Sequence, residues 1–580
     1  MLDRRDLLRR MPSFAAAGFV LRRPVIDPQP QVPPPLAFRH GVASGDPAPD
    51  RVVLWTRVST EDPGTVAVRW AVARDAGMTD VVASGVSRAG PERDWTVHVD
   101  VGGLAPATTW WYRFEALGQG SPVGRTRTAP GRDDRGEVRL GVVSCASYAA
   151  GLFSAYRRLA ERDLDLVVHL GDYLYESNEG DQRPHVPENE PVTLADYRAR
   201  YAQYRTDPDL QALHQRFPMA AVWDDHEVAG NAWEGGADDH NPRTEGPWGQ
   251  RRAAALQAYL EWLPLRRPDP AAPERIWRSL SLGATAELVL IDTRHDGRDR
   301  QVATSFPDPA AALADPGRRI MSEAQHEWLA ERLRTSPAAW RVVANQVVVS
   351  PLRIEVPPAV AQVGRPLGLV VAGAVMNPDQ WDGYPVARRR VLDVVAEPEV
   401  GPVVLLTGDI HSSWAFEVPA AGDPAGAPVA VELVTPSVTS AAFAQIVGSD
   451  SSLVATGAAN VVQDQLPYLR WTEWQHHGYL VVGVRPESLQ ADWWHVDAVD
   501  GSSDAEAVAA SWVAEAAEPR LRPADGPLAA RPAPPPPLPP LPAPDAGGRG
   551  VVGERLLGGA IGGVTLALGA LVVLRRRRQA

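Results

Sequence analysis

Hydrophobic and polar residues alternate in two different ways along this 580-residue chain. Between residues 37 and 128, short apolar–polar alternating segments are separated by Gly, Pro and Asp, as at 51–58, 66–72 and 110–116. A period of two predicts strands with one buried face, and the intervening residues predict turns. This part of the chain, residues 36–131, is therefore expected to form a small antiparallel β-sandwich domain.

From about residue 137 the pattern changes to short apolar runs alternating with amphipathic helical segments, one of which is expected at 322–334. Continuous apolar runs predict buried strands, and alternation with helices predicts an α/β fold whose ligands bind beyond the carboxyl ends of the strands. We assign residues 137–497 to this second domain, and we interpret the Ala- and acid-rich residues 498–530 as a tail without chemistry. The expected strands are 138–144, 166–170, 220–223, 288–291, 342–349 and 403–407.

Both ends of the chain predict a location outside the cytoplasm. Residues 1–35 begin with Arg4-Arg5, and a short apolar stretch follows, which is typical of a twin-arginine export signal. Residues 556–574 carry no charge and are long enough to cross a bilayer, and the basic tail 575–580 would remain in the cytoplasm. The Pro-rich segment 531–550 predicts an extended stalk. We expect export by the twin-arginine machinery and anchoring to the outer face of the cytoplasmic membrane.

The composition excludes several reaction classes. All 58 cationic side chains are arginine, so lysine-dependent P-loop, kinase and pyridoxal chemistry are excluded. The net charge of −13 argues against nucleic-acid binding, which needs a basic face. The lone cysteine, Cys145, cannot form an intramolecular disulfide. It is therefore either a small buried hydrophobic residue or a reactive or metal-ligating thiol.

Polar clusters follow five of the predicted strands, at the positions where such folds bind ligands. One such cluster alone would be compatible with ordinary turn or cap chemistry. Five in sequence, each after an apolar run, indicate a functional site. The clusters are Ser144-Cys145, Gly171-Asp172-Tyr173-Leu174-Tyr175, Asp224-Asp225-His226-Glu227, Asn345-Gln346 and Gly408-Asp409-Ile410-His411.

This order of clusters resembles the dinuclear metallophosphoesterases and, among them, the alkaline phosphatase D (PhoD) group with its purple-acid-phosphatase-like metal site. The likeness spans roughly residues 36–497 and includes residues 38–47, 53–57, 291–294 and 381–385. It implies two mixed sheets flanked by helices, preceded by a fibronectin- or immunoglobulin-like β-sandwich. It also implies hydrolysis of phosphomonoesters or phosphodiesters by a metal-activated water.

The resemblance further implies two metal sites that share Asp172. Cys145, Tyr175 and His411 would complete one of them, and Asp225, Asn345 and Asp409 the other. Thiolate and phenolate donors favour Fe³⁺, and an all-oxygen set suits one or two Ca²⁺ ions.

Four further residues receive candidate roles. His226 would stabilise the transition state or protonate the leaving group, unless it is a structural histidine. Arg294 would clamp a phosphate oxygen, unless it forms a surface ion pair. Asp224 and Asn231 are candidates for supporting the metals or contacting phosphate. Two alternatives to the phosphatase remain open: a phospholipase D-like enzyme acting on lipid head groups, and a non-catalytic surface adhesion protein.

Overall fold

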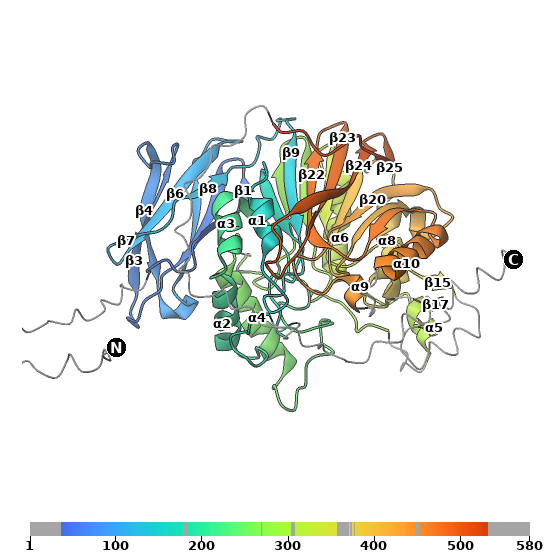
Figure 1. Ribbon diagram of the computed structural model, residues 1–580, viewed down its shortest axis with the longest axis horizontal. Coiled ribbons are helices and arrows are strands. Elements are labelled where there is room, and N and C mark those ends of the chain that lie inside the picture. Colours follow the sequence, from blue (N-terminus) through green and yellow to red (C-terminus); the bar gives the residue numbers. More distant parts are fainter. Residues whose placement is uncertain are drawn as a thin grey trace, which may run out of the picture. The chain divides into compact units, whose positions relative to one another are not determined.

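The computed structural model in Figure 1 describes residues 36–531, except 178–179, 181, 268, 303–307, 356–369, 372–373, 376 and 447–451. The predicted export signal (1–35), most of the predicted stalk and the predicted membrane helix and basic tail (556–580) lie outside these residues. Within the described part of the chain, no helix has both the length and the apolar character needed to cross a membrane.

The architecture is built on two large sheets. The first has ten strands in the order β25-β24-β23-β22-β9-β10-β11-β1-β2-β5, and the second has seven in the order β12-β13-β14-β18-β20-β19-β21. The strands that matter for function are β9 (Val138–Val143), β10 (Leu166–His169), β11 (Pro218–Ala221), β13 (Ala286–Leu290), β14 (Trp340–Ala344) and β18 (Val403–Thr407). All six predicted strands are therefore present, with boundaries shifted by a few residues.

The remaining strands complete these sheets and a smaller one. In the first sheet they are β1 (Val42–Ala48), β2 (Arg51–Arg57), β5 (Thr96–Gly102), β22 (His477–Val484), β23 (Ser488–Val496), β24 (Glu506–Glu515) and β25 (Glu518–Pro523). In the second they are β12 (Arg278–Leu282), β19 (Ser413–Pro419), β20 (Pro428–Val434) and β21 (Leu469–Glu473). A three-stranded sheet contains β15 (Ile354–Glu355), β16 (Val370–Val371) and β17 (Ala374–Val375).

Alternating side chains along each strand create the layers. Val142 faces a core shared with Leu288 and Leu406 of the second sheet, whereas its neighbour Val143 packs toward helix residues such as Tyr156. Successive side chains of a strand point to opposite faces, so one apolar run serves two cores. The two sheets therefore pack face to face, and helices cover their outer faces.

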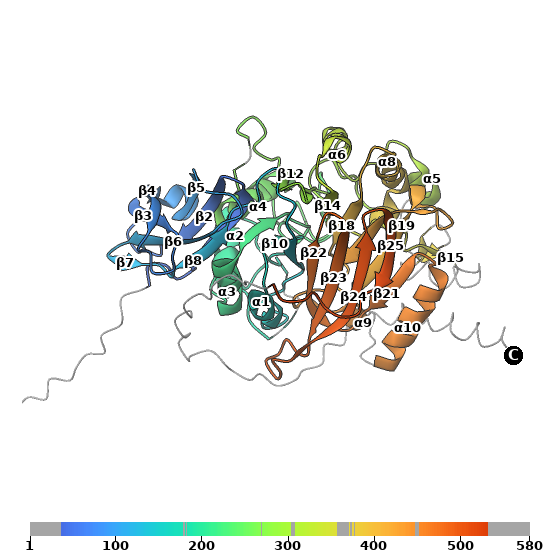
Figure 2. The ribbon, with the colours of Figure 1, turned by 90° about the horizontal axis from the view of Figure 1, so that it is seen from above.

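Helices α1 (Ser154–Ala160), α2 (Leu194–Tyr204), α3 (Pro208–Arg216) and α4 (Trp248–Trp262) share a core with the first sheet. Helices α6 (Glu323–Thr335) and α8 (Pro385–Val395) cover the second sheet, and Figure 2 shows them side by side next to β14, β18 and β19. Ser322 caps α6 by accepting a hydrogen bond from Gln325 N–H, which confirms the predicted helix. Three shorter or peripheral helices are α5 (Pro309–Ala314), α9 (Phe443–Ile446) and α10 (Ser452–Gln465).

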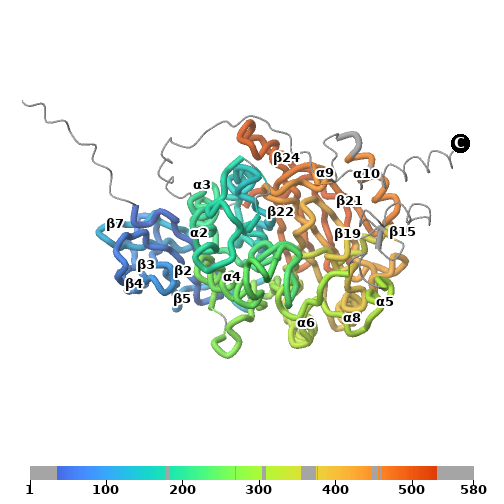
Figure 3. The backbone as a smooth tube through the Cα atoms, turned by 90° about the horizontal axis from the view of Figure 1, so that it is seen from below, coloured from blue at the N-terminus to red at the C-terminus, as the bar shows by residue number. Residues whose placement is uncertain are grey.

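The N-terminal sandwich is joined to the first sheet through its backbone. Its outer sheet contains β3 (Val66–Ala73), β4 (Val81–Ala89), β6 (Thr109–Ala116), β7 (Gln119–Gly120) and β8 (Gly124–Arg127). Its other strands, β1, β2 and β5, belong to the ten-stranded sheet, because β1 pairs in parallel with β11. The blue segment in Figure 3 accordingly adjoins the green helices. The predicted fold class is confirmed, but the sandwich shares strands with the α/β domain.

Residues 498–530 are not a tail. They contain β24 and β25, and β24 pairs with β23 from Val496↔Glu506 to Ser488↔Glu515. The tail interpretation is therefore wrong for this segment. Its Ala and Glu residues give little hydrophobic contrast and favour helix by intrinsic preference, so the strand becomes evident only beside its partner.

Candidate active site

The predicted polar clusters meet because six strands end at one place. Strands β9, β10 and β11 are parallel neighbours in the first sheet, and β13, β14 and β18 are parallel neighbours in the second. The two sets of loops approach closely, since a Cβ atom added at Gly408 after β18 would lie 2.7 Å from Ser144 Oγ after β9. Both sheets therefore contribute to one site.

Several of these loop residues adopt a backbone conformation that non-glycine residues rarely adopt. The φ angle is 60° at Cys145, 53° at Asp172, 64° at Asp409 and 50° at His411. Such left-handed conformations occur at functional sites when the surrounding structure imposes them. At these four residues, all of them predicted metal ligands, the backbone turns sharply in the loop that follows the strand.

Gly171 makes the turn after β10 possible. Its φ is 111°, and an added Cβ would lie 2.4 Å from the Cβ of Asp224 on the neighbouring loop. Only glycine combines this backbone angle with so close an approach. Gly171 therefore allows the loops after β10 and β11 to lie against each other.

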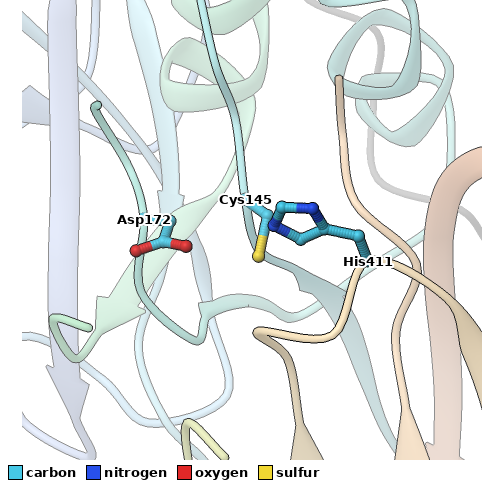
Figure 4. Close-up of side chains that lie close together, drawn as sticks. All are labelled: Cys145, Asp172 and His411. Carbon is cyan, nitrogen blue, oxygen red and sulfur yellow. The ribbon is translucent and has the colours of Figure 1, made fainter. Parts of the chain in front are cut away.

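Cys145, Asp172 and His411 converge on one point (Figure 4), and their candidate ligand atoms lie within 4.8 Å of one another. The Tyr175 hydroxyl donates to Asp172 Oδ2 at 3.0 Å and lies 3.1 Å from His411 Nε2. The carbonyl of Ala441 lies 2.9 Å from His411 Nδ1 and so orients the ring with Nε2 toward the cluster. The four predicted ligands of the first metal site are therefore assembled.

A second group of acids adjoins the first. Candidate ligand atoms of Asp224, Asp225 and Asp409 lie within 4.8 Å of one another, as do those of Asp172, Asp225 and His226. We call the set the strand-end cluster; its members are Cys145, Asp172, Tyr175, Asp224, Asp225, His226, Asp409 and His411. Asp172 belongs to both groups, as the predicted bridging role requires.

The chemistry of the strand-end cluster fits bound cations. Asp224 Oδ2 and Asp225 Oδ1 are buried and, among the described residues, accept no hydrogen bond. Burial raises the pKa of Asp172 and Asp224 well above their usual values, and it raises that of Asp409 to about 6. Buried carboxylates with unused lone pairs are stabilised by metal coordination. The observed donors therefore fit hard cations.

The thiol of Cys145 supports the same conclusion. Burial and the nearby Asp172 carboxylate raise its pKa well above the usual value, and Sγ donates to Ser144 Oγ at 3.2 Å. A thiolate in these surroundings needs a nearby positive charge, and a coordinated metal supplies one.

Arg294 is a cation that the chain itself supplies to this cluster. Its Nε donates to Asp224, its Nη1 donates to both oxygens of Asp379 at 2.8 and 2.9 Å, and its Nη2 donates to Asp409 at 2.5 Å. The side chain is fully buried, so the alternative of a surface ion pair is wrong. These bonds use four of the five guanidinium N–H groups, so a phosphate contact by Arg294, which stays a prediction, depends on the remaining hydrogen of Nη2, which lies 3.5 Å from Asp225 Oδ1.

His226 is held by a carboxylate that the sequence interpretation missed. Its Nδ1 lies 2.7 Å from Glu176 Oε2, its ring stacks on Tyr175 at 4.2 Å, and Glu176 Oε1 accepts from Gly230 N–H at 2.7 Å. Burial alone would lower the pKa of His226, but Glu176 and the neighbouring acids raise it well above its usual value. Glu176 directly follows the Gly-Asp-x-x-Tyr motif, which is the sequence signal that could have identified it.

Glu227 is a further carboxylate to which the sequence interpretation gave no role. It accepts hydrogen bonds from the N–H groups of Asp172 at 2.9 Å, Tyr173 at 2.7 Å and Asp224 at 2.8 Å. These bonds fasten the loop after β10 to the loop after β11. Glu227 therefore positions the bridging aspartate through its backbone.

Two other missed residues hold Asp409 and Arg294 from the opposite side. Gln380 donates to Asp409 Oδ2 at 2.5 Å, and Asp379 also pairs with Arg298 at 2.6 Å. Both residues directly precede the 381–385 motif that carried part of the family resemblance. Their position next to that motif was the available signal.

Two predicted residues lie differently from the rest. The Asn345 amide donates to Val347 O at 2.5 Å and Thr407 Oγ1 at 3.3 Å, and its Oδ1 accepts from Trp381 Nε1 at 3.3 Å. Within the described residues no contact joins this amide to the acidic cluster, so its ligand role stays a prediction. Asn231 is exposed, and its backbone N–H donates to Asp225 Oδ2 at 2.5 Å.

Comparison with known proteins agrees with this geometry. The sequence profile of the PhoD-like phosphatases matches residues 140–493, and that of the PhoD-like phosphatase N-terminal domain matches residues 27–130. Alkaline phosphatase D of Bacillus subtilis (strain 168) is 33% identical over 475 residues, which are 79% of this chain and 77% of that protein.

The solved structure of PhoD gives the same result. The structure of PhoD superimposes with a TM-score of 0.74 at 31% identity and covers 85% of this chain and 93% of its own. A purple acid phosphatase from yellow lupin (Lupinus luteus) seeds aligns with a TM-score of 0.49 at 12% identity, over 82% of this chain and 73% of its own.

The two-sheet fold, the strand-end cluster and these relatives define a phosphoric ester hydrolase. The chain belongs to the PhoD-like phosphatase family. The resemblance inferred from the strand-end motifs is thereby confirmed at the level of the family, and a non-catalytic adhesion protein gains no support from these comparisons.

Proposed function

We propose that the chain is an exported, membrane-anchored phosphatase that hydrolyses phosphomonoesters, phosphodiesters or both, with Fe³⁺ and Ca²⁺ as cofactors. The observation that carries this proposal is the strand-end cluster, in which a thiol, a phenol, an imidazole and several carboxylates converge in a buried site. Iron(III) suits the thiolate and phenolate donors, and calcium suits the oxygen donors.

Cys145, Asp172, Tyr175 and His411 would hold the iron. Asp172, Asp225 and Asp409 would hold calcium, and Asn345 would join them after a rotation of its amide. When bound, the metal ions neutralise charge on the phosphoryl group and activate a water molecule for attack.

The chain itself supplies a proton and the alignment of these groups. Glu176 holds Nδ1 of His226, and this ion pair favours the protonated imidazole, so we propose that His226 protonates the leaving oxygen through Nε2. Arg294 keeps Asp224 and Asp409 in place and is our candidate for contact with a phosphate oxygen.

Export and anchoring rest on the two sequence ends. The Arg4-Arg5 signal and the uncharged segment 556–574 support passage through the twin-arginine machinery and a C-terminal membrane anchor. Inserting a protease cleavage site into the 531–550 stalk tests the proposed location. Protease added to intact cells should then release phosphatase activity into the medium. Activity that stays inside the cells would contradict the proposed location.

Substrate choice is tested by comparing kcat/KM for nitrophenyl phosphate, bis-nitrophenyl phosphate and phosphatidylcholine. We expect turnover of at least one of the two nitrophenyl esters and no release of choline. Preferential release of choline would favour the phospholipase D-like alternative, and no turnover of any substrate by the metal-loaded protein would overturn the proposal.

Metal content provides the second test. Elemental analysis of the purified protein should show iron together with calcium, and a calcium chelator should abolish activity that added calcium restores. Zinc alone, or activity that survives removal of all metal, would contradict the assignment of the ligands.

A further inference from the structure

A second group of side chains with candidate metal-ligating atoms lies outside the strand-end cluster, where residues of β21 and β23 meet. Glu473, His476 and His495 each offer one ligand atom, and these atoms lie within 4.8 Å of one another. We call these three residues the edge cluster. None of them belongs to the five motifs from which the phosphatase site was predicted.

The three residues come from both sheets. Glu473 is the last residue of β21 in the seven-stranded sheet, and His476 follows it in the loop to β22. His495 lies in β23 of the ten-stranded sheet. A ligand held by all three would therefore connect the terminal strand of the seven-stranded sheet to an inner strand of the ten-stranded sheet.

The distances are close to those of a metal site. His476 Nδ1 lies 3.0 Å from Glu473 Oε1, and His495 Nδ1 lies 3.7 Å from Glu473 Oε2. Zinc–nitrogen and zinc–oxygen bonds of about 2.0–2.1 Å in a tetrahedral arrangement place neighbouring ligand atoms roughly 3.3 Å apart. The two observed spacings, each to a different oxygen of the Glu473 carboxylate, lie on either side of that value, so small side-chain shifts would seat the ion.

His495 is oriented as metal-bound histidines usually are. It is buried, and its Nε2 lies 3.0 Å from Ser413 Oγ, while its Nδ1 faces Glu473 at a distance longer than a hydrogen bond. A ligating imidazole commonly donates its other N–H to an oxygen acceptor that fixes the ring. Ser413 can accept this bond and leave Nδ1 for the metal.

The other two residues are preorganised as well. The Glu473 carboxylate accepts the N–H groups of Gln475 at 2.9 Å and His476 at 3.1 Å, which fixes its position. The rings of His476 and His495 stack with centroids 5.3 Å apart and an interplanar angle of 12°. The His476 side chain is 50% exposed, so an ion can reach the site from solvent.

We propose that Glu473, His476 and His495 bind a divalent transition metal, for which zinc is the probe, and that the ion joins the two sheets. Two imidazoles and one carboxylate with an exposed fourth position form a donor set that zinc accepts. Because the ligands belong to different sheets, binding adds to the stability of the folded protein.

The matched control is His326, which lies three residues after Glu323 in α6, as His476 lies three residues after Glu473. Near His326 the described residues offer no second imidazole that completes such a group. The full-length protein and its H476Q and H326Q variants are equilibrated with zinc, freed of excess zinc by gel filtration, and analysed for zinc per chain and for Tm.

We expect H476Q to hold about one zinc ion fewer per chain than wild type, and H326Q to hold as many as wild type. Zinc should also raise Tm in wild type and H326Q more than in H476Q. Equal zinc content in wild type and H476Q would overturn the proposal. Any zinc bound in the strand-end cluster is present in wild type and H476Q alike and does not change the difference in zinc content between them. The outcome is therefore independent of the proposed phosphatase function.

Discussion

The strand-end cluster and the edge cluster each contain a histidine whose Nδ1 faces a glutamate. The separation is 2.7 Å for His226 and Glu176 and 3.0 Å for His476 and Glu473. The Glu176 side chain has no solvent exposure, whereas the side chains of Glu473 and His476 are 22% and 50% exposed. The two pairs therefore share their contact and differ in their surroundings.

The second oxygen of each glutamate has a different partner, and this partner indicates a different role for each pair. Glu176 Oε1 accepts from Gly230 N–H, so the carboxylate is fixed to the backbone and serves one imidazole. The Glu473 carboxylate also accepts backbone N–H groups, from Gln475 and His476, but its Oε2 faces a second imidazole, that of His495. The first arrangement suits the positioning of a single proton donor, and the second suits the sharing of a metal ion.

The largest expected effect tests whether chemistry is confined to the strand-end cluster. Asp172→Asn should lower kcat at least about 10³-fold, because it removes the carboxylate common to both groups of ligands. Hydrolysis of nitrophenyl phosphate measures the loss, and circular dichroism controls for folding. Zinc binding at the edge cluster should be unchanged, and substantial retained turnover would remove the bridging role from Asp172.

A smaller effect tests the positioning of His226 by Glu176. Glu176→Gln should lower kcat about 10- to 100-fold with little change in KM, because the ring loses its charged partner. The loss should be larger for phenyl phosphate than for nitrophenyl phosphate, since the poorer leaving group depends more on protonation.

The double variant E176Q/H226Q provides the control for this prediction. If the two residues act together, it should be no more impaired than H226Q alone. Equal losses for the two substrates would instead mean that Glu176 serves only to support the fold.

A third prediction concerns His98, whose ring faces a backbone carbonyl and no carboxylate of the described residues. Burial lowers the pKa of His98 to about 3, and the ring Nε2 lies 2.9 Å from the carbonyl of Leu263. Because the folded-state pKa lies below the unfolded value of about 6.5, the unfolded chain binds the proton first as pH falls. The contribution of His98 to the free energy of unfolding is therefore fully present above about pH 6.5 and is lost as the pH falls from about 6.5 toward 3.

His98→Gln measures this contribution, since glutamine can still donate to Leu263 O but does not titrate. The free energy of unfolding of the variant should fall less steeply with acidification, by up to about 1.4 kcal/mol per pH unit. Urea unfolding at pH 7, 6 and 5 provides the measurement, and parallel curves for wild type and variant would contradict the assignment.

The smallest expected effect is that of a substitution in the edge cluster on the rate of phosphate ester hydrolysis. His476→Gln should leave kcat for nitrophenyl phosphate within about twofold of wild type, because the half-exposed His476 is not a member of the strand-end cluster. A tenfold loss would mean that the two clusters are functionally coupled and would end the comparison drawn above.

Much of the site could be predicted because it depends on strand ends. Cys145, Asp172, Asp225 and Asp409 each follow an apolar run, and parallel strands bring their carboxyl ends to one edge. The facing of two sheets then brings His411 close to Cys145. These relations follow from the order of the motifs along the chain.

The remaining features depend on contacts that no local pattern encodes. The direction of the Asn345 amide is set by Trp381 and Thr407, and the burial of Arg294 is set by Asp379 and Asp409. The pairing of β1 with β11 also joins residues that are distant in the sequence, such as Ser44 and Pro218. Side-chain orientation and long-range register arise only after the chain has folded.

The pairing of β9 with β22 has a consequence for the growing polypeptide. Val142, close to Cys145, pairs with Leu480 on one side, while β10 occupies the other. Domains generally fold as units during synthesis, and long-range pairing requires both strands to be present. A nascent chain that ends before β22 leaves the middle of its main sheet with an open edge, which is a template for aggregation. The strand that leads into the active site therefore gains its second neighbour only when synthesis is far advanced.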